Sequence, residues 1–213
     1  ASVAAEIHEG LALVWNNRTL LALAWLAGLW QILHHMQLAV LILFATRDLG
    51  LSAGEIGLVY AFGGFGCVLA SAMAERLSAW LGVGPVIVHG LALTALAWQA
   101  FGLISGSVWF ATIALGCAML VLDFGAVLFG INYLALRQAI TPDRLLGRMT
   151  ATMRFLTVAA APLGSLAGGA LATAIGLRAT LLTVGVLALL LVAGAVIWSP
   201  VRRHRKMPVV ASD

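Results

Sequence analysis

Six stretches of this sequence are almost free of charge, and each is long enough to cross a lipid bilayer. A helix needs about 20 apolar residues to span roughly 30 Å of hydrocarbon. The apolar character is continuous and does not alternate at every second residue, so it favours helices over the strands of a membrane barrel. The stretches are residues 19–44, 52–77, 85–104, 108–134, 149–175 and 179–198.

Composition points to the same class of protein. The chain has 213 residues, of which 62% are hydrophobic and 9% are charged, and its mean hydropathy is +1.06. So much apolar surface cannot be hidden inside one water-soluble core of this size. We therefore predict an all-α membrane protein whose six-helix transmembrane domain covers residues 19–198.

The segments outside this domain have their own character. Residues 1–18 read as an amphipathic lead-in and residues 199–213 as a basic tail, both in the cytoplasm. The opening residues do not form a cleavable secretory signal. Because the chain opens with Ala1 and not with Met, we expect it to be cut from a longer protein.

Positive charge marks one side of the membrane. With six spans, both termini and the second and fourth connections share a side, and only Arg47 and Arg178 lie opposite. Cytoplasmic loops carry the excess of Lys and Arg, so we predict a multi-pass protein of the cytoplasmic membrane with both termini inside. Ten of the twelve cations lie on that side: Arg18, Arg76, Arg137, Arg144, Arg148, Arg154, Arg202, Arg203, Arg205 and Lys206.

Other classes are disfavoured. Cys67 and Cys117 fall inside spans and are interpreted as packing residues, so no metal site is expected. Phosphate-binding glycine-lysine loops are absent, so an ATP-driven pump is not expected. No bound cofactor is expected either. An intramembrane serine protease needs a buried Ser within reach of a His, whereas Ser105 lies in an external turn. The cations sit at helix ends, which disfavours nucleic acid and favours the lipid bilayer as a partner.

The six stretches resemble two sets of three. After the fifth stretch, residues 174–177 (Ala-Ile-Gly-Leu) echo residues 80–83 (Trp-Leu-Gly-Val) after the second, and both second members are rich in glycine. A three-plus-three repeat, inverted in the membrane, is how many secondary transporters are built. The short third and fifth connections predict antiparallel neighbours on either side of each.

The fourth connection carries a recognisable motif. Residues 132–138 (Asn-Tyr-Leu-Ala-Leu-Arg-Gln), 141–148 (Thr-Pro-Asp-Arg-Leu-Leu-Gly-Arg) and 153–155 (Met-Arg-Phe) resemble the C-terminal half of major facilitator superfamily exporters. The closest likeness is to the branch with macrolide-efflux and enterobactin-exporter proteins, over nearly the whole chain. The resemblance implies helices seven to twelve of a twelve-helix transporter, with a missing N-terminal six-helix half as partner.

The resemblance also suggests residues that control conformation. Glu75 and Arg76 look like a shortened copy of the family's Asp-Arg loop, where charges latch the cytoplasmic ends of the two halves. A hydrated cluster at the fourth connection is a second latch or gate candidate, with positive-inside anchoring as the alternative: Arg137, Asp143, Arg144 and Arg148. In the fifth stretch a Gly-Pro signature of proton-coupled antiporters is suggested, although a bend with close helix packing explains it equally: Pro162, Gly164, Gly168 and Gly169.

Asp123 is the main candidate for chemistry. It lies near the middle of the fourth stretch, where an ionised carboxylate costs about 2.5 to 3.5 kcal/mol. Removal from water favours the neutral acid, so Asp123 could carry a proton reversibly and ionise when water or a cationic substrate arrives. The alternative is structural, a hydrogen bond to another helix. Five residues share its helix face at spacings of three, four and seven and leave a thin surface that a cavity or a partner backbone could approach: Gly116, Met119, Ala126, Val127 and Gly130.

Polar residues also interrupt the first stretch near its midpoint: Gln31, His34, His35 and Gln37. Histidine can bind and release a proton near neutral pH, and Gln can orient a polar substrate. These residues are therefore candidates for proton or substrate binding, and cross-linking of helices is the alternative. The resemblance implies that the first and fourth helices line one central cavity, so that Asp123 and the two histidines would face one space.

Together these features predict a fragment of a secondary active transporter and not an enzyme. Its expected activity is proton-coupled efflux of a hydrophobic or amphipathic small molecule, such as a drug or a siderophore. A non-transporting membrane subunit or a truncated remnant is the alternative, and it predicts that changing Asp123 affects no transport.

Overall fold

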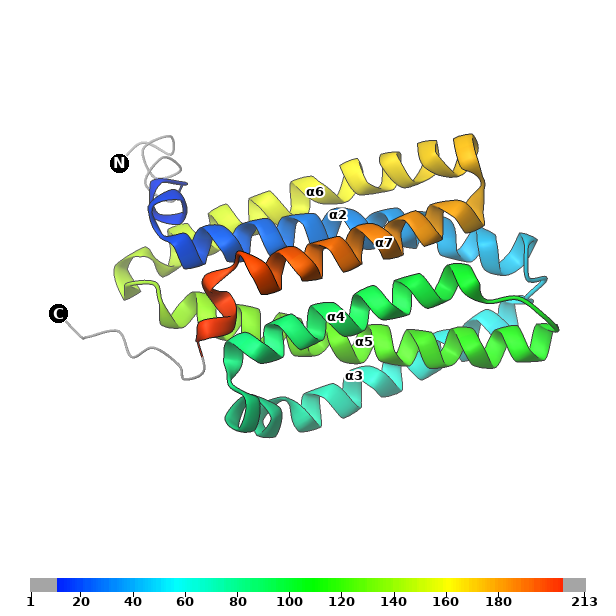
Figure 1. Cartoon of the computed structure of the whole chain (residues 1–213), viewed down its shortest axis with the longest axis horizontal. Coiled ribbons are helices and arrows are strands. Elements are labelled where there is room, and N and C mark those ends of the chain that lie inside the picture. The colour runs from blue at the N-terminus through cyan, green and yellow to red at the C-terminus, as the bar shows by residue number, and fades with distance from the viewer. Residues whose placement is uncertain (1–10, 205–213) are drawn as a thin grey trace.

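The computed structural model describes residues 11–204, in which six long helices and two short 3-10 turns are found (Figure 1). All six helices are long and apolar enough to cross a membrane, which confirms the predicted all-α membrane fold. The elements are α2 (Arg18–Arg47), α3 (Ala53–Leu81), α4 (Val83–Leu103), α5 (Val108–Ala139), η1 (Asp143–Leu145), α6 (Leu146–Ile175), α7 (Leu177–Ile197) and η2 (Pro200–Arg203).

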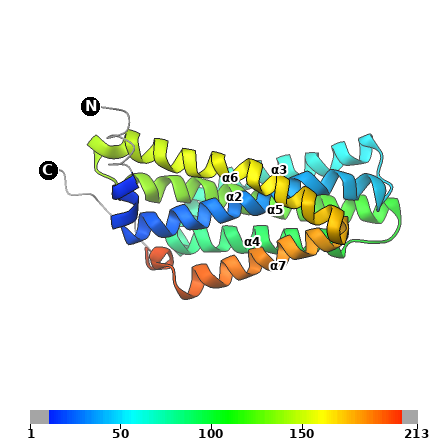
Figure 2. The ribbon, with the colours of Figure 1, turned by 90° about the horizontal axis from the view of Figure 1, so that it is seen from above.

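The helices lie side by side in one bundle, and the first and last described residues lie at the same end of it (Figures 1 and 2). An even number of crossings requires this arrangement. Residues 11–16 are helical and precede α2. The rest of the predicted lead-in, residues 1–10, lies outside the described residues, as do residues 205–213 of the predicted tail.

Local sequence signals fix where the helices begin. The Asn17 side chain accepts hydrogen bonds from the backbone N–H groups of Thr19 at 3.0 Å and Leu20 at 3.1 Å, which caps α2. Ser52 and Glu55 form the reciprocal capping box expected at the start of α3, and the Ser52 N–H donates to Glu55 Oε2 at 2.7 Å. Such bonds satisfy amide groups that have no partner inside the helix.

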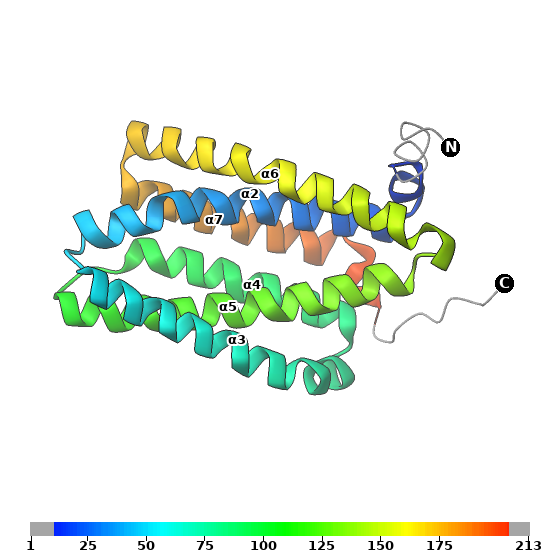
Figure 3. The ribbon, with the colours of Figure 1, turned by 180° about the vertical axis from the view of Figure 1, so that it is seen from behind.

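The packing repeats between the two halves of the chain (Figure 3). α3 packs along α5 as α6 packs along α2, α4 contacts α5 as α7 contacts α2, and α4 and α7 contact each other. This pattern is unchanged when α2, α3 and α4 are exchanged with α5, α6 and α7. The structure therefore carries the predicted three-plus-three repeat, with six helices consistent with half of a twelve-helix transporter.

The two glycines of the sequence echo occupy equivalent turns. Gly82 ends α3 and begins α4 with φ 93°, and Gly176 ends α6 and begins α7 with φ 87°. Residues other than glycine rarely adopt such values. The helices that follow, α4 and α7, both have 21 residues.

The fifth connection joins antiparallel helices as predicted, but α6 and α7 contact each other much less than each contacts α2. The described part of the predicted tail packs on the bundle, because Val201 of η2 is fully buried and the Gly84 N–H donates to the His204 carbonyl oxygen at 2.9 Å. η2 thus closes the end of the bundle over the start of α4.

Burial is unequal among the helices. In the most apolar stretch of each helix, the share of buried residues is 56% for α4, 22% for α3 and 17% for α6. The main core gathers large side chains of α2, α4, α5 and α7, among them Phe44, Trp98 and Phe101, which are fully buried. α3 and α6 therefore lie outermost and each presents a wide apolar face.

Candidate functional site

Asp123 lies where α5 meets α3. Gly63 of α3 packs directly against its carboxylate, and Asp123 also interacts electrostatically with Tyr60 and Cys67. These three α3 residues share one helix face, because they are spaced by three and four positions. The carboxylate is half-buried and has no hydrogen-bond or ion-pair partner among residues 11–204. It is therefore placed to bind a proton or an incoming polar group.

Small residues bring the two helices together around this carboxylate. The Phe62 ring lies 3.0 Å from the position that a Cβ atom on Gly116 would occupy, and Gly66 packs against the backbone carbonyl of Leu120. α3 thus covers the part of the predicted thin surface near Gly116, whereas Gly130 has open space around it. Further along, Ser78 Oγ donates a hydrogen bond of 2.7 Å to Asn132 Oδ1 and links the same two helices.

A second polar cluster surrounds His34 of α2. The His34 ring stacks on Trp30 with centroids 4.9 Å apart, and it lies 6.2 Å from the Trp98 ring of α4. Trp30 Nε1 donates to Thr94 Oγ1 at 3.2 Å, so the cluster joins α2 to α4. The Nδ1 atom of His34 is buried and has no partner among the described residues.

The neighbouring candidates on α2 face different surroundings. His35 Nδ1 lies 3.0 Å from the backbone oxygen of Gln31, and the Cβ of His35 meets Gly164 of α6. The Gln37 side chain is 1% exposed, and its amide nitrogen has no partner in the described part of the chain. His34 and Gln37 thus point into the bundle, whereas His35 lies at the α2–α6 contact.

The structure does not join all of these residues into one cluster. Asp123 contacts α3, His34 contacts α4, and His35 contacts α6. α2 and α5 contact each other only slightly. Within residues 11–204, no three His, Cys, Asp or Glu side chains form a group that could hold a metal ion. The arrangement offers separate polar positions inside an apolar bundle.

Comparison with known families identifies the chain. The family model of the Major Facilitator Superfamily matches residues 16–212. The chain belongs to the Major Facilitator Superfamily. Members of this superfamily are generally membrane transporters, so the six helices belong to a multi-pass transport protein. No curated protein and no solved structure matches the chain.

The latch candidates all lie at one end of the bundle. At this end α3 and α5 end and α6 begins. Glu75 and Arg76 are exposed near the end of α3, Asp143 and Arg144 are exposed in η1, and Arg148 is half-buried in α6. Arg137 was expected to be hydrated, and this expectation is wrong, because its side chain is only 7% exposed. It donates to Tyr133 Oη at 3.2 Å and stacks on the Tyr133 ring one turn earlier.

The glycines of α6 divide into two groups. Gly164 packs against the backbone oxygen of Ile32 and Gly168 against that of Met36, so both hold α6 close to α2. Gly169 is exposed with open space around it, and Pro162, inside the helix, is exposed as well. Close packing therefore accounts for two of the four conformational candidates.

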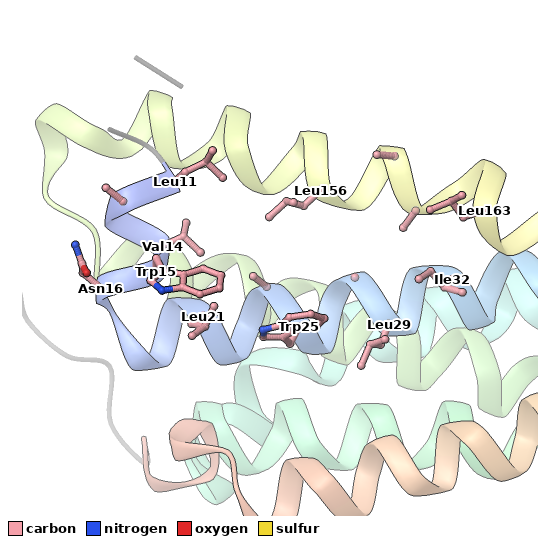
Figure 4. Close-up of a pocket in the computed structure, with 15 residues that line it drawn as sticks. Leu11, Val14, Trp15, Asn16, Leu21, Trp25, Leu29, Ile32, Leu156 and Leu163 are labelled. Atoms are coloured by element: carbon pink, nitrogen blue, oxygen red, sulfur yellow. The ribbon is translucent and has the colours of Figure 1, made fainter. Parts of the chain in front are cut away.

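An apolar pocket of about 730 Å³ opens between residues 11–16, α2 and α6. Figure 4 labels Leu156 and Leu163 on α6 and Trp25 and Leu29 on α2 among the residues that line it. Trp15 closes the end nearest the N-terminus. The size lies within the range of about 300–1,000 Å³ usual for small-molecule sites.

Three residues of these sites were not predicted from the sequence. Tyr60 interacts electrostatically with Asp123, and Thr94 and Trp98 form the α4 side of the His34 cluster. Tyr60 could have been found from its position three residues before Gly63, on the glycine face of the second stretch. Thr94 is a polar interruption of the third apolar stretch, as His34 is of the first stretch, and it could have been predicted on the same ground.

Proposed function

We propose that this protein is a proton-coupled exporter of a hydrophobic or amphipathic small molecule, such as a drug or a siderophore, in the cytoplasmic membrane. Membership of the superfamily supports transport. The proposal adds the direction, the coupling ion and the class of substrate. It also places both termini in the cytoplasm, because ten of twelve cations flank the spans on that side.

One observation carries the coupling proposal, namely the unpaired carboxylate of Asp123 inside a membrane-spanning helix. A carboxylate at membrane depth is costly, and such groups face the bundle interior or a water-filled cavity. Asp123 meets a glycine and not a cation, so no salt bridge with the described residues holds it ionised. A carboxyl group in this setting can take up a proton when it is accessible from one side of the membrane and release it when it is accessible from the other.

The membrane supplies enough energy for this exchange. Exchange of one proton for an uncharged substrate moves one elementary charge, which across 100 mV is worth about 2.3 kcal/mol, whereas exchange for a monovalent cation moves no net charge and is driven by the pH gradient. Proton entry through Asp123 would then be exchanged for outward movement of the substrate, without a nucleotide. The His34 cluster is proposed as a second polar contact, because two of its buried polar atoms, on His34 and Trp98, have no partner among residues 11–204.

The pocket between α2 and α6 supports the proposed substrate class. Its lining is almost entirely apolar and includes the flat rings of Trp15 and Trp25. Such a surface binds bulky apolar groups without demanding one arrangement of hydrogen bonds. We therefore assign an amphipathic substrate, and not a sugar or an amino acid, to this protein.

The exposed faces of α3 and α6 suggest the partner. Both helices carry large exposed apolar residues, among them Phe65 of α3 and Leu166 of α6. We propose that a second six-helix unit packs on these faces and supplies the other wall of the substrate cavity. The resemblance to major facilitator superfamily exporters implies that this unit is the N-terminal half of the full protein. We also propose that the protein is similar to the branch with macrolide-efflux and enterobactin-exporter proteins.

Efflux measurements test the proposal. This six-helix unit would be expressed with its partner half in vesicles, and efflux of a lipophilic cation would be followed under an imposed pH gradient. Asp123→Asn should abolish the dependence of efflux on the gradient. Substrate exchange without a gradient should persist in the same variant, because exchange needs no proton.

Asp48→Asn is the matched control, because Asp48 is exposed at the end of α2 outside the apolar core. It should leave coupled efflux unchanged. Coupled efflux that is equal in Asp123→Asn and the native protein would refute the carrier role and would favour a non-transporting subunit or a remnant.

A further inference from the structure

A second groove runs between α2 and α7 and ends at η2. It adjoins the pocket of Figure 4, with which it shares Leu21, Trp25, Leu29 and Ile32 of α2. It encloses about 950 Å³. Its floor is apolar along two helical faces, with Leu26 and Leu33 on α2 and Leu187 and Leu191 on α7. These two helices run antiparallel through the membrane, so the groove extends from one membrane surface into the hydrocarbon region.

Two cations stand at one end of this groove. Arg18 is the first residue of α2 and Arg202 lies in η2, and both line the groove and are exposed. Among the described residues that line the groove, there is no other cation and no acidic residue. The groove is therefore apolar along its length and positive at the membrane surface, which is the charge pattern complementary to an anionic amphiphile.

The positive end is held in place by tertiary contacts. Val201, next to Arg202, is fully buried, and the backbone of Gly84 contacts it. Thr19 Oγ1 and His204 Nε2 lie 3.3 Å apart and tie η2 to the start of α2. The two arginines are thus carried by two elements that are fixed against each other.

Aromatic residues mark the depth of this end in the membrane. Trp198 is 82% exposed at the end of α7 and Trp25 is 60% exposed on α2, and both line the groove. Exposed tryptophans concentrate at the level of lipid head groups. The arginines therefore lie at head-group height and the leucines at acyl-chain height.

We propose that this groove binds one anionic phospholipid. Arg18 and Arg202 bind its phosphate, and one acyl chain lies between α2 and α7. Basic pockets between transmembrane helices favour anionic head groups, and each cation near such a surface contributes about a fivefold gain in binding. The occupant is a molecule other than the exported substrate, whose proposed pocket lies between α2 and α6 and shares four lining residues of α2 with this groove.

Native mass spectrometry tests the proposal. The purified protein would be titrated in detergent with dioleoyl phosphatidylglycerol and with dioleoyl phosphatidylcholine, which have the same acyl chains. We expect at least about a tenfold preference for the anionic lipid at the first bound molecule. Arg18→Gln and Arg202→Gln should each lower this preference about fivefold, whereas the corresponding lysine variants should keep most of it.

Two controls separate this site from general attraction. Arg47→Gln removes an exposed cation at the opposite end of the bundle and should leave the preference unchanged. Gly194 lines the groove with only ordinary contacts around it, so Gly194→Leu should block the acyl chain and weaken the first binding event. Gly28→Leu, which fills the other pocket, should not.

Three results would overturn the proposal. The first is equal binding of the two lipids, which would indicate a nonselective apolar surface. The second is an equal loss of preference in Arg47→Gln, which would indicate attraction by net charge alone. The third is unchanged binding in Gly194→Leu, which would indicate a phosphate site on the surface without a chain in the groove.

Discussion

Gly63 of α3 lies so close to Asp123 of α5 that a Cβ atom at position 63 would overlap with the Asp123 carboxylate. The same atom would lie 2.9 Å from Cγ of Met119. The position of the only carboxylate in the middle of a described span therefore depends on the absence of a side chain on the neighbouring helix. The glycine face of α3 and the acid on α5 form one structural unit.

Gly63→Ala should impair coupled efflux more than it impairs folding. The added methyl group displaces the end of the Asp123 side chain and not a backbone, so the carboxylate moves while the helices stay in contact. We expect coupled efflux to fall about tenfold or more, since small misplacements of a reacting group are costly. Gly64→Ala, with open space around it, should leave efflux unchanged. Equal effects of the two variants would contradict this relationship.

Gly66→Ala and Gly164→Ala should instead lower stability. Each methyl group would meet a backbone oxygen of the partner helix, that of Leu120 or that of Ile32. Helix backbones cannot yield as side chains do, so we expect each change to cost about 1–3 kcal/mol of unfolding free energy. Thermal unfolding in detergent, followed by circular dichroism, measures this. Exposed Gly169 is the control, and a loss of stability in Gly169→Ala equal to the other two would argue against the packing role.

Arg178 should stabilise the end of the bundle opposite η2. Its Nη1 donates to the carbonyl oxygens of Gly102 and Ile104, both at 2.9 Å, and its guanidinium lies 5.0 Å from the Phe44 ring centroid. Arg178→Gln removes the charge from both bonds, which should cost about 1.5–3 kcal/mol. Exposed Arg47, at the same end, should be replaceable by Gln at little cost. Chemical denaturation of the two variants distinguishes these outcomes.

Ser78 and Asn132 should be energetically coupled. Asn132 is 2% exposed, and besides accepting from Ser78 it donates to the Leu128 carbonyl oxygen at 2.9 Å. Interhelical hydrogen bonds in membranes contribute about 0.6–2 kcal/mol. A double-mutant cycle with Ser78→Ala and Asn132→Ala should return a coupling energy in that range. Additive effects would mean that the bond does not hold α3 to α5.

Much of this fold follows from linear patterns. The six helices are set by hydrophobic length, and the start of α3 by the Ser52 capping box, because both signals act within one segment. The Gly82 and Gly176 turns could be predicted from their echo, since positive φ at these turns favours glycine. The closeness of α3 to Asp123 could also be anticipated, because small residues on one helix face admit a partner backbone.

Side-chain contacts account for what the sequence did not reveal. Arg137 has the charge of a surface residue, yet it donates a hydrogen bond to Tyr133 one turn earlier and lies over its ring. α7 follows α6 directly but packs on α2 and on α4, and Gly102 and Gly185 allow the close approach of α7 to α4. Neither pairing is visible in the hydrophobic pattern, because that pattern identifies an apolar helix without identifying the neighbour that it contacts.

Proton movement driven by substrate tests the central claim most directly. Proteoliposomes that contain this six-helix unit with its partner half, and a pH-sensitive dye inside, would be given an outward gradient of the lipophilic cation and no pH gradient. Because coupling is reciprocal, the native protein should move protons inward as the substrate leaves. Asp123→Asn should move substrate without protons. Proton influx of equal size in the Asp123→Asn variant would contradict the account.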